Sequence, residues 1–209
     1  LASIPKIAKE LDFKGVIMGV WDIFDKNELN NAAVMSKYVD GYCVGNEGLY
    51  VRYNLEELKS VMDYLKKSTH KPVTTTEQIT DYAKKDVMEL GDWAFPNVHP
   101  FLCGVKSPFK AVEWIKKYCQ IIKRHASALN KPVLFKEIGY PTKGDALASK
   151  DNQRKFFILM EMSDVKFAYF EAFDQYWKQW LPVEPYWGLF DKNRVPKKFI
   201  AERLERRGE

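Results

Sequence analysis

Short apolar runs rich in β-branched residues alternate with amphipathic stretches of helical spacing along the chain. This alternation is the sequence pattern of parallel βαβ units, in which each strand is followed by a helix that packs against the sheet. Six strands are expected, at residues 15–20, 40–44, 72–76, 92–99, 131–136 and 166–173. The fourth should be short, because Pro96 cannot donate to a strand ladder. The pattern predicts an α/β fold with a parallel sheet.

The helix signals are clearest at two places. Asn54 is followed three residues later by Glu57, which is the spacing of a capping box, and Leu58, Met62 and Leu65 then recur at helical intervals. Ser107 precedes Pro108, a combination that favours a helix start. Further helices are expected near 5–11, 27–38 and 151–163 and from residue 196 onward. Helices and strands therefore alternate through the chain.

Six strands are too few for a closed barrel of such units, which needs eight strands and typically about 250 residues. We predict a (β/α)8 TIM barrel as a single domain over residues 1–209, with two strands missing from the front or lying upstream. Two alternatives remain open, namely closure by dimerisation and a true six-stranded variant. Truncation is favoured, because the chain begins partway into a helix that no strand precedes.

Composition excludes several classes of protein. The 33 basic and 28 acidic residues give a net charge of only +5, with lysines scattered through expected helices, which indicates solvated helix faces and no nucleic-acid partner. Cys43, Cys103 and Cys119 have no zinc-ligand spacing and are interpreted as buried thiols. No apolar run is long enough for a membrane span, and no signal peptide is evident. We expect neither a metal nor a cofactor.

Acidic residues at the ends of expected strands are the candidate chemical groups, because (β/α) barrels carry their chemistry where strands meet loops. They are Glu47, Glu77, Glu137 and Glu171. Retaining glycoside hydrolysis needs two carboxyl groups about 5–5.5 Å apart, and spacing alone does not assign their roles. Rings that suit pyranose faces accompany them at Trp21, Tyr140, Trp177, Tyr186 and Trp187. A salt bridge or helix cap is the alternative for any single glutamate, but together the groups favour a sugar cleft.

Six motifs in order resemble glycoside hydrolase family 17, the β-1,3-glucanases and glucanosyltransferases of clan A. They are VGNEG at 44–48, VTTTE at 73–77, NVHPF at 97–101, EIGYP at 137–141, YFEAFDQYWK at 169–178 and YWGLF at 186–190. The resemblance implies that Glu47, after Asn46, is the acid/base and that Glu137 is the nucleophile. It also implies that the visible strands are barrel strands 3–8.

The resemblance suggests further site residues. Asn46 is expected to bind the sugar 2-hydroxyl, and Lys178 and Glu184 are expected to form a pair near the nucleophile. Gln175 stands where the family commonly has an acid, which implies weaker binding at that subsite. The other expected substrate contacts or cleft residues are Glu77, His99, Phe101, Tyr140 and Trp177. For His99 a buried structural role is an equal alternative, and Glu171 is expected to be a buried partner for a lysine.

The leading hypothesis is a retaining β-1,3-glucan hydrolase that acts by double displacement through a covalent glycosyl-enzyme. A transglycosylase with the same residues is the first alternative, and a non-catalytic glucan-binding barrel is the second. Action on β-1,4-linked glucan or mannan is less favoured, because the YWGLF and FDQYWK segments fit family 17 better. The expected partner is a β-glucan oligosaccharide or polysaccharide. The resemblance implies an extracellular or cell-envelope location, and an oligomer remains open if the barrel is incomplete.

Overall fold

The computed structural model describes residues 3–208, apart from the side chain of Arg207, and contains the six predicted strands. The strands are β1 (Ile17–Val20), β2 (Gly41–Val44), β3 (Val73–Thr75), β4 (Asn97–Val98), β5 (Phe135–Ile138) and β6 (Phe167–Tyr169). Each overlaps its expected range. They form two three-stranded sheets, in the orders β1-β2-β3 and β4-β5-β6.

The helices agree with the expected ones and include two short additional helices between β3 and β4. They are α1 (Ile4–Glu10), α2 (Lys26–Val34), α3 (Leu55–Thr69), α4 (Ile79–Tyr82), α5 (Lys85–Glu89), α6 (Pro108–Ala128), α7 (Lys150–Glu161) and α8 (Lys198–Arg207), with 3₁₀ turns at Met35–Tyr38 and Glu184–Tyr186. The additional helices are α4 and α5. They carry too few residues to show a helical period in the sequence.

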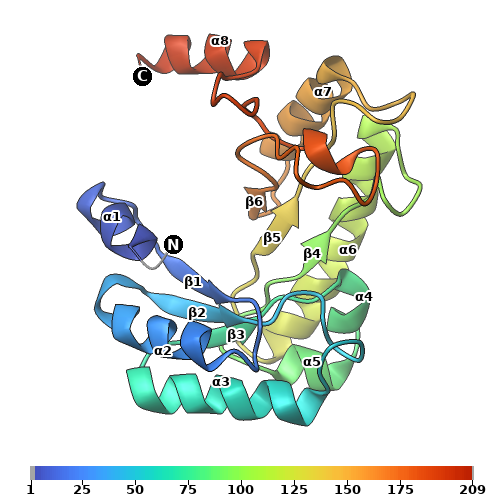
Figure 1. The fold of residues 1–209 in the computed structure, drawn as a ribbon. Coiled ribbons are helices and arrows are strands. Elements are labelled where there is room, and N and C mark those ends of the chain that lie inside the picture. The colour runs from blue at the N-terminus through green and yellow to red at the C-terminus, as the bar shows by residue number, and fades with distance from the viewer. Residues whose placement is uncertain (1–2, 209) are drawn as a thin grey trace. The chain divides into compact units, whose positions relative to one another are not determined.

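The first sheet is parallel throughout and is covered on one face by α2 and α3 (Figure 1). The predicted capping box starts α3, since Asn54 accepts from the N–H of Glu57 at 2.9 Å and Glu57 accepts from that of Asn54 at 2.8 Å. Leu58, Met62 and Leu65 on this helix are buried. The helix thus presents to the sheet the apolar stripe that the sequence predicts.

The strand ladder stops beside β3. The segment before β4 accepts hydrogen bonds there from side-chain hydroxyls. Thr74 Oγ1 donates to the Trp93 carbonyl at 2.6 Å, and Thr76 Oγ1 donates to the Phe95 carbonyl at 2.8 Å. Pro96 has no N–H to donate, so β4 is only two residues long. Within residues 3–208 the strands form two separate sheets and no closed barrel, where the sequence suggested part of one continuous barrel.

The described chain divides into two compact units. The first comprises residues 3–97 and 122–134, and the second comprises residues 98–121 and 135–208. The chain crosses the division three times, once within β4, once within α6 and once just before β5. In the second unit, aromatic rings of α7 pack beside β5 and β6, with the Phe156 and Tyr140 ring centroids 5.4 Å apart and those of Phe157 and Tyr169 also 5.4 Å apart.

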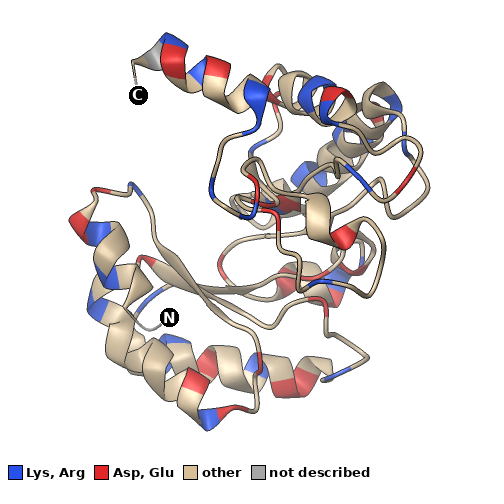
Figure 2. Ribbon diagram, turned by 45° about the horizontal axis from the view of Figure 1, so that its top comes forward, with Lys and Arg blue, Asp and Glu red and all other residues tan. Residues whose placement is uncertain are grey.

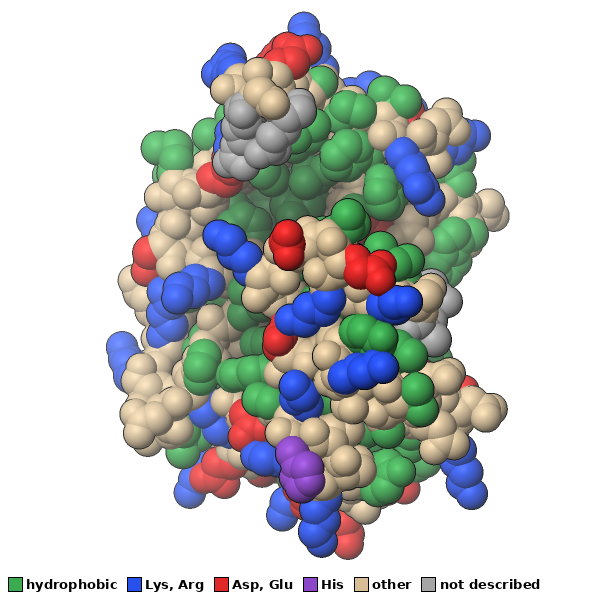
Figure 3. Space-filling model, turned by 90° about the vertical axis from the view of Figure 1, so that its left-hand side faces the viewer, with side chains coloured by type: hydrophobic (Ala, Val, Ile, Leu, Met, Phe, Trp, Pro, Cys, Tyr) green, Lys and Arg blue, Asp and Glu red, His purple; other side chains and the backbone are tan. Residues whose placement is uncertain are grey.

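Charges of both signs are interspersed along the helices (Figure 2), and Lys and Arg are scattered among acidic and apolar side chains on the face drawn in Figure 3. No helix in the part of the chain that the structure describes is long and apolar enough to cross a membrane. Cys43 and Cys119 are buried, but Cys103 is exposed. The prediction of three buried thiols is therefore wrong at Cys103.

Candidate active site

The carboxyl ends of the first sheet carry three of the expected site positions. Trp21 follows β1, Glu47 lies three residues beyond β2, and Glu77 lies two residues beyond β3, so parallel pairing brings their loops to one edge of the sheet. The Trp21 side chain is 59% exposed, and the Arg52 guanidinium lies 4.2 Å from its ring centroid. This edge presents a flat aromatic face and a half-buried carboxylate, Glu47.

Asn46 is also half-buried in the loop after β2. Its carbonyl oxygen accepts a hydrogen bond from Arg52 Nη2 at 2.6 Å, and its backbone N–H donates to the Tyr53 hydroxyl at 2.9 Å. Arg52 also donates to the Trp21 carbonyl at 3.3 Å. Arg52 and Tyr53 thus fix the backbone carbonyl and N–H of Asn46, although neither residue belongs to a sequence motif of the site.

Glu77 occupies a different environment from the one expected. Its side chain has no exposed surface, Oε1 accepts from the Tyr53 hydroxyl at 2.7 Å and from Thr75 Oγ1 at 3.2 Å, and Oε2 accepts from the Leu49 N–H at 3.2 Å. Both carboxylate oxygens therefore serve the protein itself. This position corrects the expectation that Glu77 contacts substrate, because the carboxylate offers no accessible atom to a sugar.

In the second unit, Glu137 lies on β5 beside two nitrogen groups. Lys136 Nζ is 2.8 Å from Glu137 Oε1, and His99 Nε2 is 3.4 Å from Oε2. Burial opposes ionisation of this carboxyl, but the hydrogen bond from His99 and the charge and hydrogen bond of Lys136 outweigh it and lower the pKa of Glu137 to about 2. The Glu137 side chain is 17% exposed, so this ionised carboxylate is still partly accessible from the solvent.

His99 is held among aromatic rings. The rings of Phe170 and Trp187 pack against it in T-shaped arrangements, with centroids 5.3 and 5.5 Å from that of His99. Its Nδ1 is buried and has no hydrogen-bond partner within the described residues. His99 thus touches the expected nucleophile through Nε2 while packing fixes its ring, which agrees with its predicted place near Glu137.

The loop after β6 is tied to Glu171. Lys178 Nζ lies 2.9 Å from both Glu171 oxygens, and Gln175 donates to Glu171 Oε2. The prediction that Glu171 is a buried partner for a lysine is confirmed. The ion pair of Lys178 is with Glu171 and not, as expected, with Glu184, although the charge of Lys178 still acts on Glu184. Gln175 Oε1 accepts from the indole of Trp177 at 2.8 Å.

Glu184 is a second acidic group in the same unit, and only 8% of it is exposed. Burial raises the pKa of its carboxyl, against the opposing charges of Lys178 and His99 and with support from Glu171 and Glu137. Within residues 3–208, no hydrogen bond or ion pair to this carboxylate is formed. The pKa of Glu184 is thus shifted toward the neutral form, whereas that of Glu137 is shifted toward the charged form.

The aromatic residues expected to line the cleft divide into two groups. Trp177 is 67% exposed and offers a ring face to a ligand. Tyr140 and Phe101 are buried, their rings meet edge-on at 5.0 Å, and the Tyr140 hydroxyl lies 3.1 Å from the Leu147 carbonyl oxygen. Trp187 is also fully buried. These three rings belong to the core of the second unit. Tyr140 and Phe101 therefore offer no ring face to a sugar, contrary to the expectation that they contact substrate.

Two residues near the expected catalytic glutamates were missed by sequence reasoning. Lys136 precedes Glu137, and its adjacency was the available signal, although neighbours on a regular strand normally face opposite ways. Tyr53 lies six residues after Glu47 in a turn, and no periodicity marks it. The long side chain of Lys136 reaches the carboxylate of its own neighbour, and the chain turns back so that Tyr53 contacts the residues beside Glu47. Residue spacing predicts neither contact.

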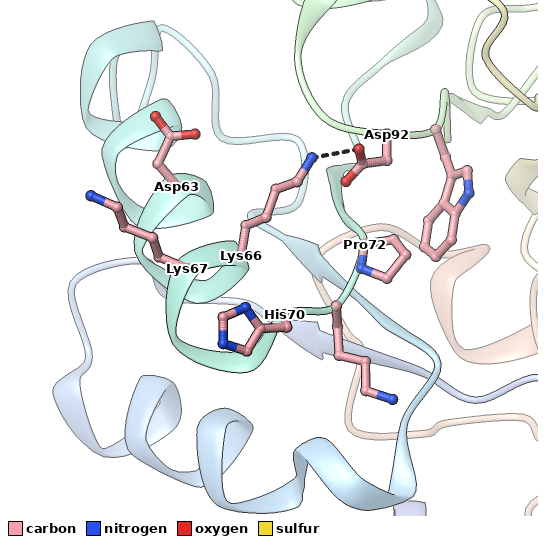
Figure 4. Close-up of a pocket in the computed structure, with 8 residues that line it drawn as sticks. Asp63, Lys66, Lys67, His70, Pro72 and Asp92 are labelled. Carbon is pink, nitrogen blue, oxygen red and sulfur yellow. Dashed lines mark hydrogen bonds and ion pairs between the residues drawn. The ribbon is translucent and has the colours of Figure 1, made fainter.

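The first unit also has a hollow of about 750 Å³ between the end of α3 and the start of β3 (Figure 4). It lies at the amino end of β3, whereas Glu47 and Glu77 follow the carboxyl ends of β2 and β3. Its lining is Asp63, Lys66, Lys67, His70, Lys71, Pro72, Asp92 and Trp93. Lys66 and Asp92 form an ion pair across it at 2.6 Å. The hollow contains none of the expected site residues.

Relatives of the chain are glucan-processing proteins by name. It is 26% identical over 246 aligned residues to a probable glucan endo-1,3-beta-glucosidase btgC of Aspergillus fumigatus, an alignment that covers 93% of this chain and 34% of that protein. The chain thus spans about a third of the length of the curated relatives it matches.

Two solved structures share the fold. An active-site mutant of the Rhizomucor miehei beta-1,3-glucanosyltransferase, in complex with laminaritriose, matches with a TM-score of 0.79 at 22% identity, over 93% of this chain and 78% of that one. A Cryptomeria japonica pollen beta-1,3-glucanase and allergen matches with a TM-score of 0.63 at 16% identity, over 87% and 81% of the two chains. The family follows from the sequence: the model of the BtgE/BtgC glycoside hydrolase domain matches residues 1–188 of the 209, and the chain belongs to that family.

Proposed function

We propose that this glycoside hydrolase domain cleaves β-1,3-glucan with retention of configuration, with Glu137 as nucleophile and Glu47 as acid/base. The observation that carries the proposal is the position of the Glu137 carboxylate between Lys136 Nζ and His99 Nε2. Lys136 and His99 lower its pKa to about 2 although it is mostly buried, which keeps a carboxylate ionised where an attack on an anomeric carbon needs it.

The chemistry is a double displacement. Glu47 protonates the leaving glycosidic oxygen while Glu137 attacks the anomeric carbon, and water deprotonated by Glu47 then releases the sugar. This mechanism needs the two carboxyl groups about 5–5.5 Å apart. A (β/α)8 arrangement of family 17, in which β1–β6 serve as barrel strands 3–8, meets that need because the carboxyl ends of its strands share one face.

The remaining site residues have supporting roles in this proposal. Asn46, beside Glu47, binds the 2-hydroxyl of the sugar at the cleavage point. His99 supports the ionised form of Glu137, and the exposed ring of Trp177 stacks on a pyranose face. Gln175 keeps Trp177 in place through its side-chain oxygen, which accepts from the indole N–H.

The substrate class follows from the names of similar proteins and remains part of the proposal, because this chain spans about a third of those curated relatives. They are called glucan endo-1,3-beta-glucosidases. Transglycosylation is the second candidate, favoured by the fold similarity to a beta-1,3-glucanosyltransferase. The two outcomes share all catalytic residues and differ in whether water or a sugar hydroxyl takes the glycosyl group from Glu137.

Azide rescue of two alanine variants tests the assignment of roles. The substrate is an aryl β-laminaribioside with a good leaving group. With Glu137→Ala, azide should attack directly and give the α-glycosyl azide, because no carboxylate precedes it. With Glu47→Ala, Glu137 still forms the glycosyl-enzyme, so azide should give the β-glycosyl azide. Glu113→Ala on the exposed part of α6 is the control and should keep wild-type turnover.

The outcomes separate the hypotheses. A β-glycosyl azide from Glu137→Ala together with an α-glycosyl azide from Glu47→Ala would reverse the roles of Glu47 and Glu137. If the intact chain releases no reducing sugar from laminarin and makes no longer oligomers, the proposed activity on β-1,3-glucan is wrong. Longer products in excess of reducing sugar identify a transglycosylase.

A further inference from the structure

The loop that carries Glu47 donates every backbone N–H from residue 45 to residue 49. The N–H of Glu47 donates to the Thr76 carbonyl at 3.0 Å, and that of residue 45 donates to the end of β1 at 2.8 Å. The other three go to side chains, two to the hydroxyl of Tyr53 and one to the carboxylate of Glu77. The conformation of this loop therefore depends on two buried side chains.

The hydroxyl of Tyr53 uses its full hydrogen-bonding capacity. It donates its proton to Glu77 Oε1 at 2.7 Å and accepts from the N–H groups of Asn46 at 2.9 Å and Gly48 at 3.2 Å. One donor and two lone pairs are all that a tyrosine hydroxyl offers. Its two acceptor bonds hold the residues immediately before and after Glu47, so the hydroxyl brackets that residue.

Contact with the ring adds to this control. A β-carbon on Gly48 would overlap the hydroxyl end of the Tyr53 ring, so the backbone of the loop lies directly against this ring. Burial comes first among the causes that raise the pKa of Tyr53, followed by its hydrogen bond to Glu77, and the hydroxyl therefore keeps the proton that it donates. Tyr53 is 4% exposed.

Glu47 needs such control because its backbone is in the left-handed region, with φ of +48°. For a residue other than glycine this conformation is strained and persists only where the surroundings enforce it. The observed hydrogen bonds at Asn46, Glu47 and Gly48 supply that enforcement. Without them the loop would relax and the carboxyl of Glu47 would point elsewhere.

We propose that Tyr53 and Glu77 are positioning residues, which aim the carboxyl of Glu47 for proton donation and do not themselves touch the sugar. The inference rests on the proposed acid/base role of Glu47. Glu77 acts through Tyr53 and through the Leu49 N–H, and its complete burial keeps the sugar away from it. Tyr53 acts directly on the backbone beside Glu47.

The test compares two tyrosine-to-phenylalanine variants in the same unit. Tyr53→Phe removes the hydroxyl that brackets Glu47. Tyr82→Phe is the matched control, because the Tyr82 hydroxyl is also buried, donates to the Thr75 carbonyl at 2.6 Å and accepts from the Phe95 N–H at 3.1 Å, while none of the loop N–H groups at residues 45–49 donates to it. Any loss from general destabilisation should appear in both variants.

The first readout is the dependence of kcat/KM on the leaving group. Proton donation matters for a sugar leaving group and hardly matters for dinitrophenolate. Tyr53→Phe should therefore lower kcat/KM on laminari-oligosaccharides by about 10- to 100-fold, as displacement of a general acid does, but lower it less than about threefold on a dinitrophenyl β-laminaribioside. Glu77→Gln should change the ratio in the same direction, and Tyr82→Phe should leave it unchanged.

The second readout needs no activity. Backbone amide exchange at residues 46 and 48 should become roughly five- to tenfold faster in Tyr53→Phe, since each of these N–H groups loses its hydrogen-bond acceptor. Exchange at Tyr42, whose N–H donates to the Pro72 carbonyl at 2.9 Å, should stay the same.

The two readouts distinguish failure of the inference from failure of the proposed function. A wild-type chain that turns over neither substrate contradicts the proposed function, and the exchange rates then decide whether Tyr53 holds the loop. Equal losses on both substrates in Tyr53→Phe, or losses matched by Tyr82→Phe, would overturn the positioning role. So would unchanged amide exchange at residues 46 and 48.

Discussion

The charge on Glu137 depends on two neighbours of different kinds, a flexible lysine adjacent in sequence and a histidine fixed by rings. The pKa of this carboxyl is about 2, against an ordinary value of 4.5. A carboxyl whose pKa is lower in the folded state stabilises the fold above the unfolded value, and this contribution is lost as the pH falls through the folded value. Folding and chemistry thus favour the same charged form of Glu137.

Glu137→Gln tests this coupling without requiring activity. The difference in unfolding free energy between wild type and variant should stay constant above about pH 5. Between pH 4.5 and pH 2 the wild type should lose on the order of 3 kcal/mol of stability relative to the variant. Urea unfolding at a series of pH values measures it, with Glu205→Gln on the exposed part of α8 as the control. A difference that is independent of pH down to 2 contradicts the low pKa of Glu137.

At the residue scale, motif order placed Glu47 and Glu137 at strand ends and predicted the neighbourhood of His99 and Glu137. Motifs did not predict which acid Lys178 pairs with, because that depends on how the loop after β6 folds back on the strand. They also gave Glu77 a surface role, whereas a buried tyrosine brings that carboxylate inside. Side-chain partners across a loop have no period in the sequence.

At the scale of elements, helices were predicted more closely than strands. The capping box and apolar stripe of α3 match the structure, since both arise from local spacing. The fourth strand was expected to be short and to lie within residues 92–99, and β4 is two residues long; just before Pro96, the hydroxyls of Thr74 and Thr76 donate to the carbonyls of Trp93 and Phe95. Competition between side-chain and backbone donors is a tertiary effect that strand propensity does not include.

The segment after β6 is fastened to the start of α8 by a buried ion pair between Asp174 and Lys197. The pair is 3.1 Å apart, and Thr142 Oγ1 accepts from Lys197 Nζ at the same distance. Burial raises the pKa of Asp174 and lowers the pKa of Lys197, against their mutual attraction. Desolvation therefore exceeds the attraction in both partners, as buried pairs commonly show.

Lys197→Met should destabilise the protein by about 3–5 kcal/mol, because it leaves the carboxylate of Asp174 buried without its cation. Adding Asp174→Asn should restore most of that loss, since asparagine keeps the oxygen that accepts from the Gly188 N–H at 2.9 Å. Urea unfolding measures both variants, and Lys198→Met, on an exposed side chain, is the control. Equal instability of the single and double variants would show that the pair itself stabilises the fold.

At the scale of the whole chain, the two compact units are not consecutive pieces of sequence. The first takes residues 122–134 from beyond the start of the second, and α6 continues across the division without a break. Ile122 on α6 is buried in the first unit, and Ile115 on the same helix is buried in the second. Unfolding either unit releases one end of this helix and removes the packing that supports the other end, so the alternation of strands and helices should unfold as one system.

Calorimetry should accordingly show a single unfolding transition. Leu65→Ala in the first unit and Phe156→Ala in the second each remove a fully buried side chain, at a cost of about 2–5 kcal/mol. Each should move the whole transition down by roughly 5–15 °C, with the calorimetric enthalpy equal to the van't Hoff enthalpy. If the wild type shows two transitions and Leu65→Ala moves only one, the units fold independently, because cooperativity through α6 would have moved both.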